Sequence, residues 1–178
     1  GGDIGGNTAG GDGGGVNNDG DLDINGGDIG GNTAGGNGGG INNGGSADIT
    51  DSDITGNEAT GDGGGINNDG TLNMENGTIG NNNAQYGGGV AAVGGTFTVY
   101  NGTISGNTAA NTGGGVYVDS DTNTTFTAAG GKILNNKKGS VGDSNVYVVG
   151  GAPFKVEDAL PDTTEIYVDH GIGAVFTN

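Results

Sequence analysis

The chain has 178 residues, of which 47 are glycine and two are proline, and it contains no cysteine or tryptophan. Twenty-one carboxylates face four cationic side chains, which gives a formal net charge of −17. Glycine does not fall at every third position and proline is nearly absent, which excludes collagen, and 30% apolar residues argue against a flexible linker. No apolar run approaches the roughly 18 residues that cross a membrane, and the absence of cysteine excludes disulfides and thiolate metal sites.

The negative charge is concentrated in the first part of the chain. Residues 1–75 carry eleven Asp and two Glu with no cation, which accounts for −13 of the total. Such a surface repels phosphate groups, so we expect neither nucleic acid nor an anionic membrane as a partner, and no membrane insertion. The sequence has no initiating methionine and no signal-like segment, so we expect a mature or excised piece.

A repeat of about 25 residues runs along the chain. Each copy opens with I-x-x-N followed two residues later by alanine, and five copies begin at Ile4, Ile29, Ile54, Ile79 and Ile104. G-G-G-[VI] comes next and ends at Val16, Ile41, Ile66, Val90 and Val116. A third apolar pair follows, at Leu22/Ile24, Ala47/Ile49, Leu72/Met74 and Phe97/Val99. A looser sixth copy begins at Ile133.

Each copy therefore offers three apolar stretches that are too short for helices and are separated by Gly, Asn, Asp and Thr. This pattern predicts an all-β parallel solenoid with three strands per coil and six to seven coils. Coils stacked about 4.8 Å apart would make a rod roughly 30 Å long. We expect residues 1–150 to form the coils. Residues 151–178 are expected to form the last coil and a cap, with strands at 152–156 and 165–168, a turn at Pro161, and Val175 and Phe176 closing the core.

The recurring asparagine is predicted to be structural. Equivalent residues of successive coils lie above one another, so their amides can bond along the column and satisfy the corner backbone. The expected ladder comprises Asn7, Asn32, Asn57, Asn82, Asn107 and Asn136.

The pairing of G-G-G-[VI] with I-x-x-N resembles the repeats of chlamydial polymorphic outer-membrane proteins. It is even more similar to repeat-rich surface proteins of Gram-positive gut bacteria, as in residues 101–109, 113–118 and 145–148. The resemblance covers about residues 1–150. It implies a right-handed parallel β-helix, export to the cell surface, and a role as an adhesin or stalk.

Many β-helices act on polysaccharides, so an enzymatic function is one alternative for such a fold. The chain has no arginine, and its lysines begin only at Lys132. Its one histidine, His170 in Asp169-His-Gly171, faintly resembles a glycosidase element but has no acidic-pair motif around it. We therefore expect no catalytic residues and no enzyme, with a polysaccharide-active enzyme as the alternative.

Calcium is the one cofactor for which the sequence offers candidate ligands. Asp3, Asp28 and Asp53 share one repeat position, and stacked charges about 5 Å apart repel each other by roughly 1 kcal/mol even in water. The alternating carboxylates Asp19, Asp21 and Asp23 are oxygen ligands of the type that calcium prefers. Neither an EF-hand loop nor the nonapeptide of calcium β-rolls is present. A solvated acidic face and calcium sites both remain open.

Other surface features are weaker. An ice-binding threonine array is not expected, because Glu58 and Asn83 interrupt the column of Thr8, Thr33 and Thr108. Tyr117 and Tyr147 are predicted to stack in neighbouring coils, either as a carbohydrate platform or as ordinary packing. The glycine runs around Gly39 and Gly64 suggest a bare backbone face that another chain could cover.

The first residue falls inside a repeat, so the N-terminal end is expected to be open to further strand pairing, either by adjacent coils or by other copies of the chain. We predict a non-enzymatic, extracellular structural or adhesive module of a larger bacterial cell-surface protein. Its partners would include glycans or host surface proteins. The alternative is a subunit that stacks end to end into an extracellular filament.

Overall fold

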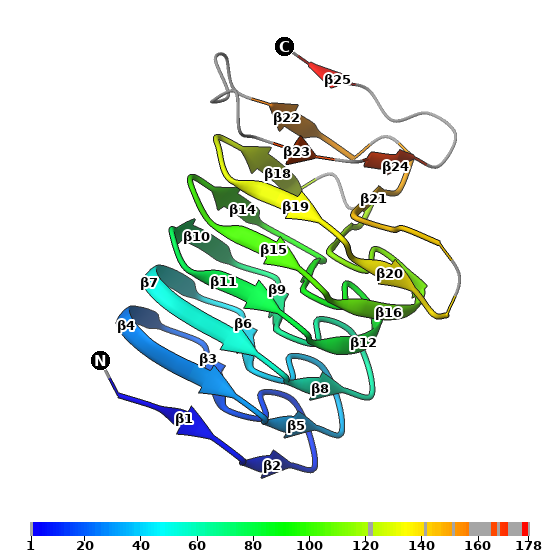
Figure 1. The fold of residues 1–178 in the computed structure, drawn as a ribbon. Coiled ribbons are helices and arrows are strands. Elements are labelled where there is room, and N and C mark those ends of the chain that lie inside the picture. Colours follow the sequence, from blue (N-terminus) through cyan, green and yellow to red (C-terminus); the bar gives the residue numbers. More distant parts are fainter. Residues whose placement is uncertain are drawn as a thin grey trace.

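The structure is a computed structural model of the chain. It describes residues 2–120, 123–140, 142–150 and 152–156, and the backbone alone of 165–166, 168–170 and 176–177. These residues form strands, turns and bends that wind in stacked coils from the N-terminus to the C-terminal strands (Figure 1). Within them, no helix is long and apolar enough to cross a membrane.

The strands assemble into three parallel sheets, which we call A, B and C. Sheet A contains β1 (Ile4–Gly5), β4 (Asp21–Gly30), β7 (Ser46–Thr55), β10 (Thr71–Glu75), β11 (Thr78–Gly80), β14 (Thr96–Val99), β15 (Thr103–Ser105), β18 (Thr125–Ala128), β19 (Lys132–Leu134), β22 (Phe154–Val156), β23 (Glu165–Ile166) and β25 (Phe176–Thr177). Sheet B contains β2 (Thr8–Ala9), β5 (Thr33–Ala34), β8 (Glu58–Ala59), β12 (Asn83–Tyr86), β16 (Thr108–Thr112) and β20 (Lys137–Lys138). Sheet C contains β3 (Val16–Asn18), β6 (Ile41–Asn43), β9 (Ile66–Asn68), β13 (Val90–Ala92), β17 (Val116–Val118), β21 (Val146–Val148) and β24 (Val168–His170).

Each coil visits sheet A, sheet B, sheet C and then sheet A again, so sheet A has two arms. The ten-residue strands β4 and β7 run through the corner between the arms (Figure 1). In the next coil the corner separates β10 from β11 at Asn76 and Gly77, whose φ values are 61° and 73°. Asparagine and glycine tolerate this left-handed conformation better than other residues, which explains the Asn-Gly pair at the corner.

The register confirms the predicted parallel solenoid of about six coils. Residues one repeat apart are direct Cα partners along the whole stack. The G-G-G-[VI] position, for example, forms the column Val16, Ile41, Ile66, Val90, Val116 and Val146. The residue after each ladder asparagine and the alanine that follows it form the short strands of sheet B. Each coil therefore has four strand segments, whereas the sequence predicted three.

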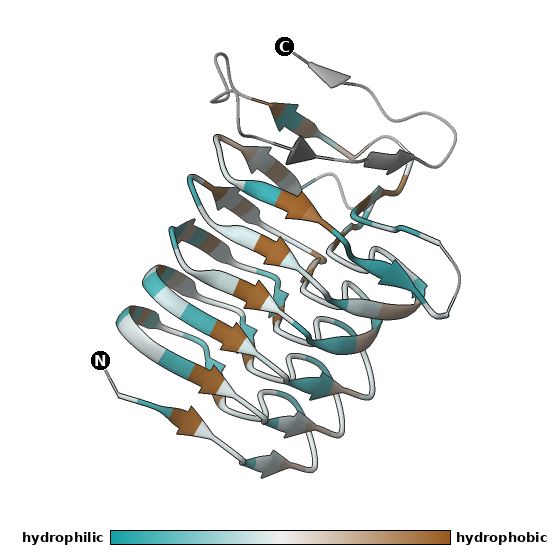
Figure 2. Cartoon of the chain, in the orientation of Figure 1, coloured by the Kyte–Doolittle hydropathy of each residue, from teal (hydrophilic) through white to brown (hydrophobic). Residues whose placement is uncertain are grey.

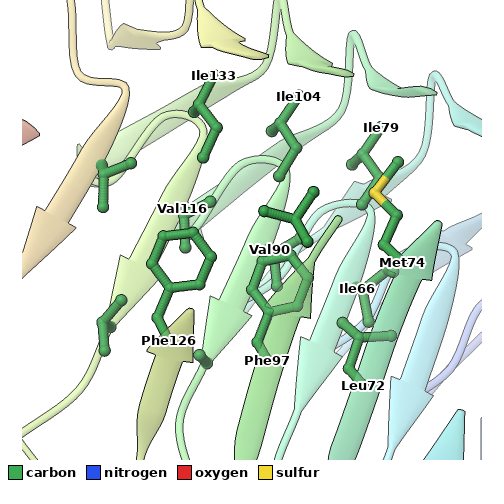
Figure 3. Close-up of a cluster of buried hydrophobic side chains, with 14 of the residues drawn as sticks. Ile66, Leu72, Met74, Ile79, Val90, Phe97, Ile104, Val116, Phe126 and Ile133 are labelled. Carbon is green, nitrogen blue, oxygen red and sulfur yellow. The ribbon is translucent and has the colours of Figure 1, made fainter. Parts of the chain in front are cut away.

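The core is a narrow column of apolar side chains inside the coil. The repeat isoleucines form one hydrophobic row that runs from strand to strand (Figure 2). Phenylalanines fill the later coils, with Phe97 stacked on Phe126 at 5.0 Å between ring centroids and Phe126 on Phe154 at 5.1 Å. Figure 3 shows Phe97 and Phe126 side by side below Ile104 and Ile133. Each fully buried side chain of this kind stabilises the coil by about 1.5–3 kcal/mol.

The glycine runs do not form a bare face for another chain, which corrects the expectation for Gly39 and Gly64. Both residues are buried within the coil stack. A Cβ on Gly64 would lie 2.5 Å from the backbone oxygens of Asn83 and Gly88 in the next coil. Glycine is required here because neighbouring coils approach too closely for any side chain.

The end of the chain continues the stack. Phe154 pairs with Phe126, and the backbone of Phe176 pairs in turn with Phe154. The predicted strand at 165–168 appears as β23 and the start of β24. Pro161 and Val175 lie outside the described residues.

Candidate functional site

The predicted asparagine ladder is present. Asn57 Oδ1 accepts hydrogen bonds from the backbone N and from Nδ2 of Asn32, both at 3.0 Å. Asn57 Nδ2 donates onward to Asn82 Oδ1 at 3.0 Å and back to the Ile29 carbonyl at 2.9 Å. The pattern repeats at every step from Asn7 to Asn136. These amides satisfy buried backbone groups at the corner and lock the register of the coils.

The ladder has a direction and a terminus that sequence reasoning missed. Each asparagine from Asn7 to Asn107 donates to the asparagine of the following coil, so the column is polar from the N-terminal to the C-terminal end. Asn136 donates from its backbone N and from Nδ2 to Asn145 Oδ1, each at 3.0 Å. Asn145 lies in the same coil as Asn136, so it ends the column without an additional coil.

Two further asparagine ladders run along sheet C through the first three coils. The inner one joins Asn18 to Asn43 and Asn43 to Asn68, at 2.7 Å each. The outer one joins Asn42 to Asn17 at 2.8 Å and Asn67 to Asn42 at 2.9 Å. The signal for both was the Asn-Asn pair that follows G-G-G-[VI] in the first three copies.

The acidic columns lie where the repeat predicted them. Asp28 and Asp53 are direct Cα partners, and the Asp28 backbone N donates to Asp3 Oδ1 at 3.4 Å. Thr78 continues the column beside Asp53. All three aspartates are exposed, so their carboxylates are hydrated on the outer surface.

The second acidic group is also exposed and is spread over several columns. Asp21 faces Ser46 and Asp23 faces Asp48, while Asp19 lies in the turn after β3. Asn73, next in the column, donates to Asp48 Oδ1 at 2.8 Å. Among the residues that the structure describes, no group of three or more His, Cys, Asp or Glu side chains is arranged to hold a metal ion.

The threonine column of sheet B is interrupted as expected, by Glu58 and Asn83 between Thr33 and Thr108. A small array that the sequence analysis overlooked lies on sheet A instead. Thr96 faces Thr125 and Thr98 faces Thr127 across two neighbouring coils. Thr71 extends the first column to a third coil, whereas Asn73 and Lys155 occupy the flanking positions beside Thr98 and Thr127.

The structure describes the groups considered for catalysis only in part. The backbone of His170 lies in β24 opposite Val148, and its side chain is outside the described part of the chain. Lys132 and Lys137 are exposed on sheets A and B.

An open groove of about 380 Å³ lies on the outside of sheet A beside Tyr100. Tyr100 is 43% exposed. Polar side chains of two coils line the rest of the groove, namely Asp48, Thr50, Asn73 and Glu75. An aromatic ring beside several hydrogen-bonding groups is the composition of many small-molecule sites.

A second aromatic surface, which we call the tyrosine patch, lies on the outer face of sheet C. It comprises Tyr86, Tyr117, Tyr147, Asp62 and Asp119. The predicted stacking of Tyr117 on Tyr147 is present, with ring centroids 6.2 Å apart and planes at 3°. Tyr86 approaches Tyr117 to 5.1 Å between centroids, at 50°. All five side chains are half-buried.

The patch is strongly negative. Burial, followed by the carboxylates of Asp119 and Asp62 and then the neighbouring tyrosines, raises the pKa of Tyr117 to about 12. Burial and the Asp119 carboxylate also raise the pKa of Asp62, while a backbone hydrogen bond from Tyr86 lowers it. Tyr117 is therefore a protonated hydrogen-bond donor at neutral pH.

A buried acceptor lies next to the patch. Asn67 is 6% exposed, and its Oδ1 has no hydrogen-bond partner. Its Nδ2 donates to Asn42 of the preceding coil. In the following coils, Ala91 and then Tyr117 occupy the same column. The outer ladder therefore ends in an unsatisfied acceptor beside the buried Ala91.

Comparisons of this chain with protein-family models, with curated proteins and with solved structures find no match.

Proposed function

We propose that the chain is a non-enzymatic, extracellular structural and adhesive module, a rigid segment of a larger bacterial surface protein. The observation that carries this proposal is the hydrogen-bonded asparagine column from Asn7 to Asn145, which ties the successive coils along this stretch into one unit. The likeness of the repeats to those of chlamydial outer-membrane proteins and Gram-positive repeat proteins supports the extracellular location. A stalk or adhesin requires stiffness and an exposed surface rather than a catalytic cleft.

The Tyr100 groove supports the adhesive part of the proposal. Its exposed ring can stack on the apolar face of a sugar while Asp48, Asn73 and Glu75 bond to the hydroxyls. We therefore assign glycans, free or on host glycoproteins, as the ligands of this groove.

The test is a binding screen of the full chain against glycans and host glycoproteins, at concentrations where light scattering shows a monomer. We expect a subset of glycans to bind, and Tyr100→Ala to weaken that binding at least about tenfold. Thr98→Ala, on the same sheet but outside the groove, is the control. Absence of any glycan binding would overturn the adhesive role, and turnover of a polysaccharide would favour the enzyme alternative.

End-to-end assembly is the second candidate, and it would use the first coil. Ile4, Val16, Leu22 and Ile24 are only partly buried there. Three of them line a cavity of about 310 Å³ at this end. A further coil can pair with these strand edges, whether it belongs to the same protein or to another copy. Fibres in electron micrographs that disappear in Ile24→Lys would support the filament, whereas a monomer at all concentrations would exclude it.

Calcium sites on the acidic columns remain a proposal that a thermal melt decides. Specific sites would raise the midpoint with calcium and lower it with EDTA, because binding to the folded state alone stabilises it. Since the carboxylates of Asp3, Asp28 and Asp53 are exposed, we expect the midpoint to stay the same in both.

A further inference from the structure

We propose that the tyrosine patch binds the guanidinium groups of an arginine-bearing peptide segment of a partner protein. This inference rests on the proposed function, because it assigns one class of partner to the displayed module. It concerns sheet C and is separate from the Tyr100 groove on sheet A.

The geometry of the rings suits a planar cation. Tyr117 and Tyr147 are parallel and offset, and Tyr86 is tilted against Tyr117 from the neighbouring sheet. A guanidinium is flat, is attracted to the negative face of an aromatic ring and stacks on it. An extended peptide that runs along the column would meet a new tyrosine with each coil.

The negative charges of the patch also favour a cation as the ligand. Both carboxylates that act on Tyr117, those of Asp62 and Asp119, are negative and lie close enough to raise its pKa. Asp119 also acts on Asp62. A cation placed between these groups would relieve their repulsion, and its attraction would be stronger than at a fully hydrated surface because the groups are half-buried.

Hydrogen bonding selects guanidinium among cations. The two carboxylates of the patch, those of Asp62 and Asp119, are acceptors only when they are ionised. Guanidinium carries five N–H donors and no acceptor, and it binds carboxylates with two bonds at once. A lysine ammonium has three donors and does not stack, so we expect it to bind less tightly.

The side chains of the patch can be changed without breaking the coil. Asp62 occupies the same column as Asn37, whose Oδ1 accepts the Asp62 backbone N–H at 2.9 Å. Asn37 shows that an amide fits this column, so Asp62→Asn should fold. Asp119 accepts the Ser120 N–H at 2.6 Å, and asparagine can accept the same bond.

The test uses a short peptide in which arginine alternates with serine, and measures its affinity for the full chain by isothermal titration at physiological salt. The matched peptides carry citrulline, a neutral analogue, or lysine in place of arginine. The double variant Asp62→Asn/Asp119→Asn removes the two charges of the patch. The control, Asp28→Asn/Asp53→Asn, removes two exposed charges elsewhere, and Tyr117→Leu removes the central ring.

We expect the patch variant and Tyr117→Leu each to lower the affinity for the arginine peptide by about tenfold or more. The control should change it by less than about twofold. The citrulline peptide should not bind, and the lysine peptide should bind more weakly. Equal losses in the two double variants would show non-specific attraction to the −17 chain and overturn the proposal.

Binding of a neutral oligosaccharide at the patch, lost in Tyr117→Leu and kept in Asp62→Asn/Asp119→Asn, would also overturn it. The glycan screen with Tyr100→Ala tests binding at the groove on sheet A, which is separate from the tyrosine patch. Failure of the arginine proposal therefore leaves the adhesive function standing, and failure of the adhesive function leaves this titration interpretable.

Discussion

Asn136 donates two hydrogen bonds to the same oxygen, Oδ1 of Asn145, each at 3.0 Å. The two residues lie only nine positions apart in one coil, whereas the other ladder steps span 25 or 29 residues. Asn145 thus provides at the last step the acceptor that a following coil would otherwise supply. The column can end inside the protein with its donors satisfied.

Asn145→Ala is predicted to lower the free energy of unfolding by about 1–3 kcal/mol, because it leaves the buried backbone N–H of Asn136 without an acceptor and removes one bond of its Nδ2. Asn145→Asp keeps the acceptor oxygen and should lose clearly less. Chemical denaturation followed by circular dichroism measures both. Equal losses would mean that the side-chain oxygen of Asn145 does not satisfy Asn136.

Asn57→Ala is predicted to destabilise the fold more than Asn145→Ala does, since the Asn57 side chain makes four hydrogen bonds in the middle of the ladder. We expect a loss on the order of 3–5 kcal/mol, at the upper end for single substitutions. The control is Asn42→Ala in the half-buried outer ladder, where a loss of about 1 kcal/mol or less is expected. If the two variants have the same melting midpoint, the ladder from Asn7 to Asn136 is not what holds the coils together.

Gly64→Ala is predicted to prevent stable folding, because the added Cβ would lie 2.5 Å from backbone atoms of the next coil. Gly10→Ala is the matched control, as nothing lies within 4 Å of its added Cβ. Expression yield and melting midpoint distinguish them. A Gly64→Ala protein as stable as Gly10→Ala would contradict the close approach of the coils.

The solenoid and the ladder from Asn7 to Asn136 could be predicted because five copies keep one spacing. Asn145 could not, because it lies in a hairpin-like insertion between Lys138 and Val146 that breaks the period. The outer and inner ladders of sheet C were visible only as Asn-Asn pairs, whose two members point to opposite sides of a strand. Spacing alone does not say which side is buried.

The tyrosine patch was predictable only in part. Tyr117 and Tyr147 occupy equal positions in their copies, so their stacking follows from the repeat. Tyr86 lies in a copy that is one residue shorter, because the step from Ile66 to Val90 is 24 residues. Counting 25 residues from Asp62 therefore does not lead to Tyr86, although the two residues occupy successive positions in the stack. The contact of Tyr86 with Tyr117 depends on how the turn packs over sheet C, which no periodicity encodes.

Tyr117 is predicted to ionise at a higher pH than an ordinary tyrosine. Its pKa of about 12 in the folded state exceeds the ordinary value of 10, so the folded state holds the phenol proton more tightly than the unfolded state does. Stability should therefore fall as the pH rises from 10 toward 12. An absorbance titration of phenolate should show a late component that Tyr117→Phe removes. Asp119→Asn should move that component to lower pH, and a component that stays in place would contradict the assigned electrostatics.

The central claim is that the coils form one rigid unit tied by the asparagine column, and amide hydrogen exchange of the full chain tests it most directly. The backbone N–H groups of Asn32, Asn57, Asn82 and Asn107 all donate to the next asparagine. The account predicts that they exchange slowly and at similar rates, through opening of the whole stack. Exchange of Asn32 and Asn57 as fast as that of the exposed turn around Gly10, with Asn82 and Asn107 still protected, would mean that the first coils open independently. That result would contradict a rigid module.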